Sequence, residues 1–366
     1  MKWKWLISLG LVVCLVVAFT LPACAPAPPV EEEKPPVEEE KPPVEEEEEL
    51  AKSINAYMCS SKNSNAKAVA YMKEKLGVTI NQHFESVGVV HAKLKAEAPR
   101  FNADIVSHVS FPVAFDAKNN GWAIPYDSPT WRDADFPFKD PDNYWVNIGT
   151  SLFLLVYNEE MLAEKGYEAP KSWEDLLDPK WKGQIVMPSP VSSGTGYRIL
   201  YTFLTEYGFN AGKGEEGGWE FYEELNKNVH HYTKSGSTPV DLVTRKEFML
   251  GLSVTSGIAD RIKEGYPIKW FIPEGGTGYD LAAVFILKGT KEEYTCQKIV
   301  DEFGTLEFAQ YLATYSGLVS RYTQAHNALF GEYVPNWVPN IDPEWLSVNK
   351  GRLLDEWKDR IGRVAE

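Results

Sequence analysis

Residues 187–199, MPSPVSSGTGYRI, place hydroxyl side chains and glycines between an apolar segment, GQIVM, and a predicted helix. The hydroxyl groups of Ser192, Ser193 and Thr195 can donate hydrogen bonds, and so can the free amides of a first helical turn near Gly194. The helix dipole adds an attraction for negative charge. These residues predict a site for the oxygens of a phosphate, phosphonate or carboxylate. The alternative is an ordinary capped helix whose glycines serve the turn.

A second loop of the same kind, Ser235, Gly236 and Ser237, follows the predicted strand HHYT and again precedes a helix. In a doubly wound sheet, ligands bind beyond the carboxyl ends of the strands, so polar residues at other strand ends are also candidates. These candidates are Ser60, Ser61, Ser107, Thr255 and Ser256. Glu274 and Tyr279 are candidates because they lie near the place where the chain would return between the two halves of the fold. Hydroxyl residues are also common turn formers, and Glu274 fits a solvated carboxylate as well as it fits a partner for a ligand hydroxyl or amine.

The sequence contains no recognisable motif for metal binding or catalysis. HExxH, a cysteine cluster, a carboxylate triad, GxxxxGK[ST] and GxSxG are all absent. His230 and His231 are adjacent, and neighbouring residues of a strand point to opposite faces. We therefore expect no enzyme, no cofactor and no resident metal. Hydrolysis of a bound phosphate ester is the remote alternative.

Alternating strand and helix patterns surround these loops from residue 51 onward. The opening order is strand, helix, strand, helix, strand, with helices at 65–76 and 88–98, which implies a parallel sheet covered by helices on both faces. A long buried strand is predicted at 151–157, and the later strands are QIVM, HHYTKSG, MLGLSVT, IKWFIP and LAAVFIL. Further helices are predicted at 238–247, 257–264, 291–304 and 305–314. The expected fold class is α/β, in a chain long enough for two domains.

The first residues have the order of an export signal. Lys2 and Lys4 precede an apolar run that ends at Leu21, and this run is short for a membrane span. The segment LPAC, which ends at Cys24, resembles the bacterial lipobox. This resemblance implies that residues 1–23 are a lipoprotein signal peptide and that Cys24 is lipidated, which would anchor the protein to the membrane. Cleavage by the ordinary signal peptidase, without a lipid, is the alternative.

Residues 24–50 would join the lipidated cysteine to the folded part as a tether. The unit PPVEEEK repeats every seven residues, but its paired prolines forbid a continuous helix. An extended chain at ~3.1 Å per residue makes residues 28–49 about 70 Å long. Eleven glutamates and two lysines give residues 31–49 a charge of −9. Subtracting these and the two N-terminal lysines from the total of −15 leaves −8 for residues 50–366, which argues against nucleic acid as a partner.

Two cysteines remain in the folded part once the signal peptide and the lipidation site are set aside. They are Cys59 and Cys296, which could form a disulfide outside the cytoplasm. Their spacing carries no geometric information, and unpaired buried thiols are favoured.

The order of segments resembles the bacterial extracellular solute-binding proteins of ABC importers, in the branch of ferric-iron, phosphonate and sugar-phosphate binders. The stretches that carry the resemblance are NADIV with GWAIPYDSP, LFLLVYNEEML, SWEDLLDPKWKGQIVMPSPVSSGTGY, YTKSGS and PEGGTGYDLAAVFILKG. It implies a two-lobe periplasmic-binding-protein-like fold of type II, in which each lobe is a mostly parallel sheet flanked by helices. A hinge of crossing strands would join the lobes. Lobe 1 would hold residues 51–150 and 274–320, and lobe 2 residues 151–273 with part of 321–366.

The resemblance further implies a receptor that captures a solute between the lobes, closes around it and delivers it to an ABC permease with its ATPase subunits. Iron binders of the family place adjacent tyrosines where this sequence has Thr255, Ser256 and Gly257. Sugar-phosphate binders tend to carry a His-Asp pair near this point, which is also missing. The sequence therefore predicts a small anionic solute, foremost a phosphonate or a phosphorylated organic compound. Fe(III), a polyamine or a carboxylate are the alternatives.

These patterns also predict where the protein works and with what partners. We expect an extracytoplasmic monomer that is lipid-anchored to the cell membrane through Cys24. Its expected partners are the anionic ligand and the importer subunits, and nucleic acid is not among them.

Overall fold

The computed structural model describes residues 48–60, 62–135, 138–273, 276–322, 324–325 and 342–362. Contacts divide the chain after Glu47, and the fold described below is that of the second unit, Glu48–Glu366. The predicted signal peptide and the predicted lipidation site Cys24 lie outside the described residues. Two candidate ligand-binding residues, Ser61 and Glu274, lie outside them as well.

Three parallel strands open the fold at one side of a large sheet. β1 (Ser53–Met58), β2 (Thr79–Phe84) and β3 (Ile105–Val109) are connected by α1 (Lys62–Leu76) and α2 (Val87–Glu97). Many of their apolar side chains are buried in one cluster, which also receives residues of the later helices. This arrangement confirms the predicted opening order of strand, helix, strand, helix, strand. We call this part of the sheet the β1 side.

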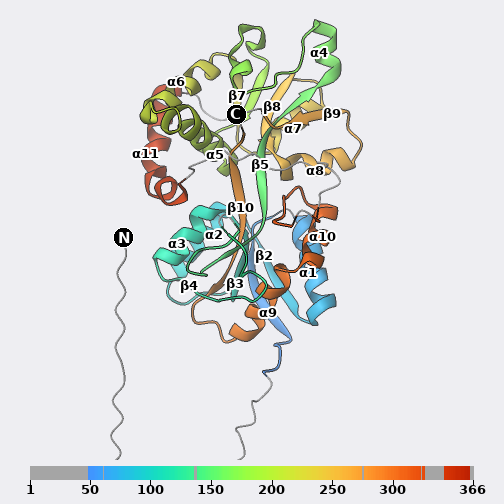
Figure 1. Ribbon diagram of the computed structural model, residues 1–366, viewed down its shortest axis with the longest axis vertical. Coiled ribbons are helices and arrows are strands. Elements are labelled where there is room, and N and C mark those ends of the chain that lie inside the picture. Colours follow the sequence, from blue (N-terminus) through green and yellow to red (C-terminus); the bar gives the residue numbers. More distant parts are fainter. Residues whose placement is uncertain are drawn as a thin grey trace, which may run out of the picture. The chain divides into compact units, whose positions relative to one another are not determined.

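Two long strands connect the β1 side with the rest of the sheet. β5 (Val146–Asn158) and β10 (Tyr279–Leu287) pair antiparallel, and Figure 1 shows them running between the lower and upper groups of elements. β5 pairs first with β10 and then, from Phe153 onward, with β8 (Leu250–Val254). These strands are the crossing segments that the sequence led us to expect. The predicted residue boundaries of the two lobes stay a prediction.

The other part of the sheet, which we call the β6 side, contains β6 (Ile185–Pro188) between β7 (Val229–Thr233) and β8, all parallel. The strand order is β2-β1-β3-β10-β5-β8-β6-β7. Two short strands lie off this path, β4 (Ala123–Ile124) on β10 and β9 (Ile268–Phe271) on β5. The helices on this side are α4 (Glu159–Lys165), α5 (Gly194–Phe203), α6 (Gly214–Asn226), α7 (Thr238–Thr244) and α8 (Thr255–Lys263).

A C-terminal helix, α11 (Pro343–Ile361), was not predicted from the sequence. Asp342 caps its start by accepting hydrogen bonds from two amides of the first turn. Leu346, Leu353 and Trp357 are buried in the main core. Figure 1 shows α11 beside α6 at the edge of the upper group. The remaining helices are α3 (Phe111–Asn119), α9 (Glu293–Phe303), α10 (Leu306–Tyr315), the 3-10 turns Glu174–Leu177 and Pro179–Trp181, and the π-helical turn Leu204–Phe209.

Some helix ends differ from the prediction. The helix predicted at 65–76 begins earlier, at Lys62. The helix predicted at 238–247 ends at Thr244, and soon afterwards Lys246 adopts a left-handed conformation with φ of 61°. A left-handed residue stops an α-helix, and sequence periodicity alone does not reveal it.

Cys59, which follows β1, and Cys296, in α9, are both free thiols. Burial raises the pKa of the Cys59 thiol to about 12. The expectation of unpaired thiols is confirmed.

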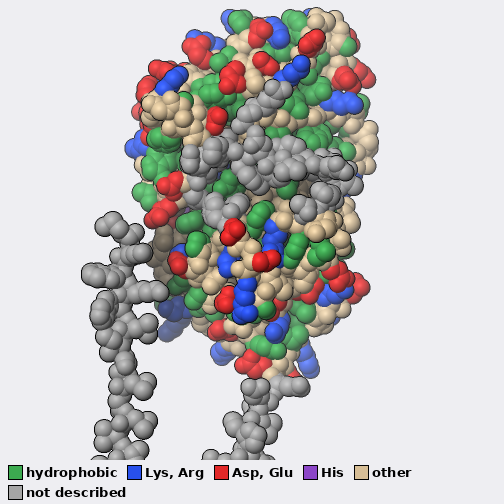
Figure 2. Space-filling model, viewed as in Figure 1, with side chains coloured by type: hydrophobic (Ala, Val, Ile, Leu, Met, Phe, Trp, Pro, Cys, Tyr) green, Lys and Arg blue, Asp and Glu red, His purple; other side chains and the backbone are tan. Residues whose placement is uncertain are grey.

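The described surface is mixed in charge. Figure 2 shows acidic and basic side chains intermingled over the described part of one face. Large exposed apolar side chains lie on separate elements, as with Phe84 of β2 and Tyr266 before β9, which is normal for a protein surface. Among the described residues, no helix combines the length and apolar character that crossing a membrane requires.

Candidate functional site

A cavity of about 290 Å³ lies where the β1 side and the β6 side meet. The crossing segments contribute Ser151 of β5, residues 280–282 of β10 and residues 316–318 after α10. The last segment is held against β5 by a bridge between Thr150 and Val319. The β1 side adds Cys59, Ser60, Ser64, Val87, His108, Ser110 and Tyr315, and the β6 side adds Thr195, Gly236, Ser237, Val254, Ser256, Gly257 and Ala259. We call this space the central cavity.

The two hydroxyl loops singled out in the sequence touch each other at this cavity. A Cβ atom on Gly236 would lie only 2.3 Å from Thr195 Oγ1 and 3.4 Å from Ser193 Oγ. The second loop is held against β8, because Ser253 Oγ of that strand donates a hydrogen bond to the Gly236 carbonyl at 2.8 Å. Segments about 40 residues apart in the sequence therefore form one hydroxyl-rich surface, and glycine at 236 permits the close approach.

Replacing Gly236 with alanine should separate the two loops while leaving the fold intact. The new methyl group would overlap both Oγ1 and Cβ of Thr195, so a change of rotamer does not relieve the overlap and one of the two loops must shift. We expect a three- to tenfold loss of solute affinity in calorimetric titration, with a melting temperature within a few degrees of the parent. Gly351→Ala is the control, since no atom lies within 4 Å of its Cβ position. Equal affinities for the two variants would contradict the prediction.

The start of α5 presents unpaired backbone donors to this surface. Ser193 is the N-cap residue, and its Oγ accepts a hydrogen bond from the Gly196 amide at 3.3 Å. The amides of Gly194 and Thr195 have no acceptor among the described residues. Free amides at the positive end of a helix dipole form a ready-made anion site.

On the β1 side, buried polar atoms without partners surround the cavity. His108, Ser110 and Tyr315 are 6%, 2% and 2% exposed, and His108 Nε2, Ser110 Oγ and Tyr315 OH lack hydrogen-bond partners in the described structure. His108 adopts a left-handed conformation (φ 60°), and its Nδ1 lies 2.8 Å from Ser107 Oγ. Burial lowers the pKa of His108 to about 4, so its ring is neutral near pH 7. Unpaired buried groups are costly, and a bound solute would supply their missing partners.

A buried ion pair joins the β6 side to a crossing strand next to the cavity. Arg198 of α5 is 6% exposed, and its Nε lies 2.9 Å from Oδ1 of Asp280 on β10, though the two atoms are not aligned for a hydrogen bond. Burial raises the pKa of Asp280 to about 6, although the positive charge of Arg198 acts in the opposite direction. Burial likewise lowers the pKa of Arg198.

The structure places the predicted site residues in two groups. Those that line the central cavity are Ser60, Thr195, Gly236, Ser237 and Ser256, with Ser193 and Gly194 adjoining at the start of α5. Those that do not line it are Ser107, Ser192, Ser235, Thr255 and Tyr279.

The residues of the second group have protein partners or lie buried. Ser192 Oγ donates to the Lys234 carbonyl at 3.3 Å, and Thr255 Oγ1 accepts from the Leu152 amide at 3.1 Å. Ser235 Oγ lies 3.1 Å from Ser237 Oγ. Tyr279 is 5% exposed. Their assignment as ligand contacts stays a prediction.

Several residues of the cavity were missed from the sequence. Asp280 is a charged residue near the start of an otherwise apolar strand, and that interruption was the available signal. Ser151 gave a weaker signal, because β5 also contains Asn147 and Thr150. Ser110 precedes a Phe-Pro helix start, as an N-cap residue would, yet its side chain makes no capping bond. No sequence pattern marked residues 316–318 as site residues. Their place at the cavity depends on a tertiary contact, the bridge between Thr150 of β5 and Val319.

Replacing His108 with asparagine should flatten the pH dependence of stability between pH 7 and pH 4. The pKa of His108 is lower in the folded protein than in the unfolded chain, so stability present above about pH 6.5 is lost as the pH falls toward 4. The parent should lose about 3 kcal/mol more than the variant across this window in urea unfolding. Asparagine tolerates the left-handed backbone, and His83→Asn at an exposed position is the control. Parallel stability curves for parent and His108→Asn would contradict the prediction.

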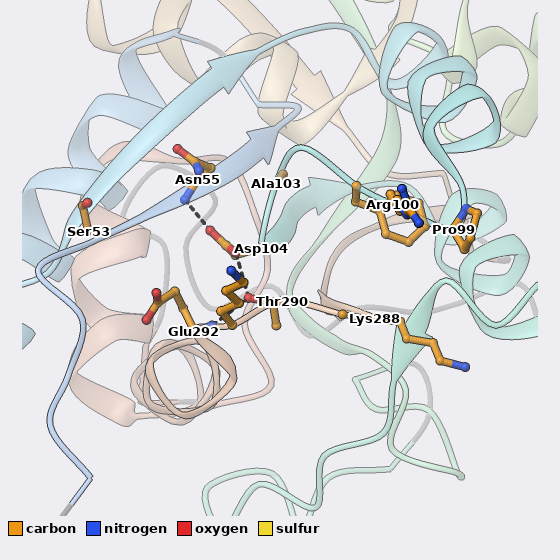
Figure 3. Close-up of a pocket in the computed structure, with 12 residues that line it drawn as sticks. Ser53, Asn55, Pro99, Arg100, Ala103, Asp104, Lys288, Thr290 and Glu292 are labelled. Carbon is orange, nitrogen blue, oxygen red and sulfur yellow. Dashed lines mark hydrogen bonds between the residues drawn. The ribbon is translucent and has the colours of Figure 1, made fainter.

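A second cavity, of about 440 Å³, lies near the start of β1 and the end of β10. Figure 3 shows Asp104 at its centre, bonded to the Asn55 amide and to Thr290 Oγ1, each at 2.7 Å. Lys288 extends away from this carboxylate. The cavity lies at the amino end of β1, whereas ligands in such sheets bind at the carboxyl ends, so the central cavity is the stronger candidate for a ligand site.

Comparison with known proteins identifies the family. The family model for bacterial extracellular solute-binding proteins matches residues 102–339. An uncharacterised protein of Haemophilus influenzae is 33% identical over 219 residues, 58% of this chain and 62% of that protein. A thiamine-binding periplasmic protein of Brucella abortus is 26% identical over 167 residues, 46% of either chain. The chain thus spans less than two thirds of the length of these relatives.

Solved structures share the fold. The periplasmic binding protein AfuA from Actinobacillus pleuropneumoniae, with fructose-6-phosphate bound, superposes with a TM-score of 0.72 at 26% identity and covers 85% of this chain and 99% of its own. Iron-bound HitA from Pseudomonas aeruginosa gives 0.69 at 17% identity, covering 83% and 98%, and shows the fold alone. The predicted α/β periplasmic-binding-protein-like fold is confirmed. Since the family model covers well over half of its residues, the chain belongs to the bacterial extracellular solute-binding proteins.

Proposed function

We propose that this protein captures a small anionic solute, a phosphonate or a phosphorylated organic compound, in the central cavity and delivers it to an ABC permease. The observation that supports this most is the convergence of unpaired donors at one place. The free amides of Gly194 and Thr195 adjoin the hydroxyl loops, and on the opposite wall the buried atoms His108 Nε2 and Ser110 Oγ have no partners among the described residues. Phosphate and phosphonate oxygens are strong acceptors that suit such donors.

The relatives support this class of solute without naming the compound. AfuA, at 26% identity, was solved with fructose-6-phosphate bound. Relatives named for iron and for thiamine keep those solutes as alternatives. Thr255 and Ser256 stand where the family resemblance puts the tyrosines of iron binders, and Ser256 Oγ is bonded to Ser151 Oγ at 2.8 Å. Because neither position carries a tyrosine phenolate, an organic anion is favoured over Fe(III).

We also propose that a lipid on Cys24 attaches the protein to the membrane. Cys24 is the lipidated residue, residues 24–50 are the tether, and the folded part works as an extracytoplasmic monomer. The lipobox-like segment LPAC and the Pro/Glu repeat support this part of the proposal. Mass spectrometry of protein purified from membranes should find acyl chains on Cys24. An N-terminus elsewhere, with no acyl mass, would contradict it.

A thermal-shift screen tests the solute class. The panel contains phosphonates, sugar phosphates, carboxylates, polyamines, thiamine and Fe(III). A true solute at a hundred times its dissociation constant should add about 2.7 kcal/mol to the stability of the folded state. We expect stabilisation by phosphorylated or phosphonate compounds. Stabilisation by Fe(III) alone, or by polyamines alone, would contradict the proposal, and turnover of a bound phosphate ester would replace it with an enzyme.

A further inference from the structure

We infer that Arg198 is the cation that recognises the anionic group of the solute and that Asp280 is a built-in competitor for it, which sets the affinity of the site. This inference rests on the proposed function and assigns the charge recognition at the central cavity to one ion pair. Neither residue stood out in the sequence as a ligand contact. The geometry of the pair, its burial and its place beside α5 carry the inference.

The guanidinium of Arg198 lies directly beside the unpaired amides of α5. A Cβ atom on Gly194 would approach Arg198 Nη1 to 3.0 Å, so the guanidinium packs against the first residue of the helix. Its Cζ lies 5.7 Å from the centre of the Phe111 ring, on α3 of the β1 side. Arg198 therefore lies at the junction of the two sides with Nη1 next to the helix start. It does not itself line the central cavity, but Thr195, three residues earlier, and its partner Asp280 both do.

The pairing with Asp280 leaves most of the guanidinium unused. An arginine commonly binds a carboxylate through two parallel hydrogen bonds. Here the closest contact joins Nε to Oδ1 at 2.9 Å without hydrogen-bond alignment. Within the described part of the chain, neither Nη1 nor Nη2 donates a hydrogen bond. Nη1 and Nη2 can therefore donate to a solute oxygen while Nε stays beside Asp280, so that the solute and the carboxylate share one guanidinium.

Asp280 opposes the solute by its charge. It lines the central cavity, and its side chain is 23% exposed although Oδ1 itself is buried. A carboxylate in this position cancels part of the positive potential that Arg198 and the dipole of α5 create. It also keeps the buried Arg198 compensated in the absence of a solute, since an isolated buried charge is costly. The pair thus keeps the empty site stable at the expense of affinity.

Lys350 supplies a second positive charge near the same helix. Its Nζ lies 5.5 Å from the centre of the Tyr197 ring, and Tyr197 directly precedes Arg198 in α5. Lys350 therefore adds positive charge beside α5. Arg198 is nevertheless the cation whose donors adjoin Gly194, which makes it the residue to test.

The test is calorimetric titration of the full chain at pH 7.5 with inorganic phosphate and with fructose 6-phosphate. Asp280→Asn should bind inorganic phosphate about five- to tenfold more tightly than the parent, because the guanidinium is no longer shared. Arg198→Met should bind both probes about 10- to 100-fold more weakly, as expected for lost hydrogen bonds to a charged group. Arg198→Met together with Asp280→Asn should bind as weakly as Arg198→Met.

The double variant keeps the test informative if Arg198→Met alone fails to fold, because it removes both charges of the pair. Arg321→Met is the matched control: Arg321 is similarly buried, with a side chain 10% exposed, and its partners Asp133, Thr130 and Gly304 do not line the central cavity, whereas Asp280, the partner of Arg198, does. Its affinities should stay within twofold of the parent.

Three results would overturn the inference. Unchanged affinity in Arg198→Met, while the parent binds the probes, would make the pair purely structural and leave the proposed function standing. Weaker phosphate binding by Asp280→Asn would show that Asp280 assists the anion instead of competing with it. Failure of the parent to bind every phosphorylated and phosphonate compound of the thermal-shift panel, as well as both probes, would remove the proposed function itself, and the inference with it.

Discussion

Replacing Gly196 with alanine is expected to lower stability by about 3 kcal/mol and to reduce solute affinity at least tenfold. A Cβ atom at this position would lie 2.4 Å from the Pro188 carbonyl oxygen and 2.5 Å from the Ser189 carbonyl carbon. Both are backbone atoms where the chain leaves β6, so no side-chain rotation relieves the overlap. The start of α5 would have to move away from β6, taking the amides of Gly194 and Thr195 with it.

Thermal unfolding and calorimetric titration with a phosphate ester together measure this effect. Gly88→Ala is a matched control, because Gly88 also lies in the first turn of a helix near the cavity and no atom lies within 4 Å of its Cβ position. We expect the control to keep both the melting temperature and the affinity. An affinity for Gly196→Ala equal to that of the parent would mean that the start of α5 does not hold the solute.

Replacing Trp357 with alanine is expected to destabilise the protein by about 3–5 kcal/mol, the usual range for removing a buried tryptophan. Trp357 is 1% exposed and meets Tyr232 of β7 edge to face, with ring centres 5.0 Å apart. The Trp357 side chain fixes α11 against the core. α11 in turn supports α5, because Tyr197 OH of α5 donates a hydrogen bond to the Leu346 carbonyl of α11 at 2.6 Å. We therefore expect weaker solute binding in addition to lower stability.

Urea unfolding measures the stability loss, and Val348→Ala provides the control within the same helix. Val348 is 79% exposed, so its truncation should change stability by less than about 0.5 kcal/mol. A loss below 1 kcal/mol for Trp357→Ala would show that α11 is not an integral part of the core.

The strands and the hydroxyl loops could be predicted because their signals are local. Apolar runs bounded by glycine and polar residues identified β1, β3 and β6, and Ser193 stands at the N-cap position that its residue type indicates. The two loops could be predicted to lie near each other because parallel strands end at the same edge of a sheet. Their direct contact at Gly236 depends on tertiary packing and could not be predicted.

The rest of the site depends on which distant segments become neighbours. Asp280 reaches the cavity because β10 pairs with β5, and its partner Arg198 comes from a helix about 80 residues earlier. The left-handed backbone of His108 is imposed by its surroundings, and no residue pattern announces it. α11 was missed because its position is set by contacts with α3 and α6, far away in the sequence.

The most direct test of anion binding compares a phosphate ester with its parent alcohol. Fructose 6-phosphate and fructose are titrated calorimetrically into the full chain. The two compounds differ only in the phosphate group, which the start of α5 and Arg198 are proposed to hold. We expect fructose 6-phosphate to bind at least 100-fold more tightly, with a large part of that difference lost in Arg198→Met. Equal binding of the two compounds, or binding of fructose alone, would contradict recognition of an anion in the central cavity.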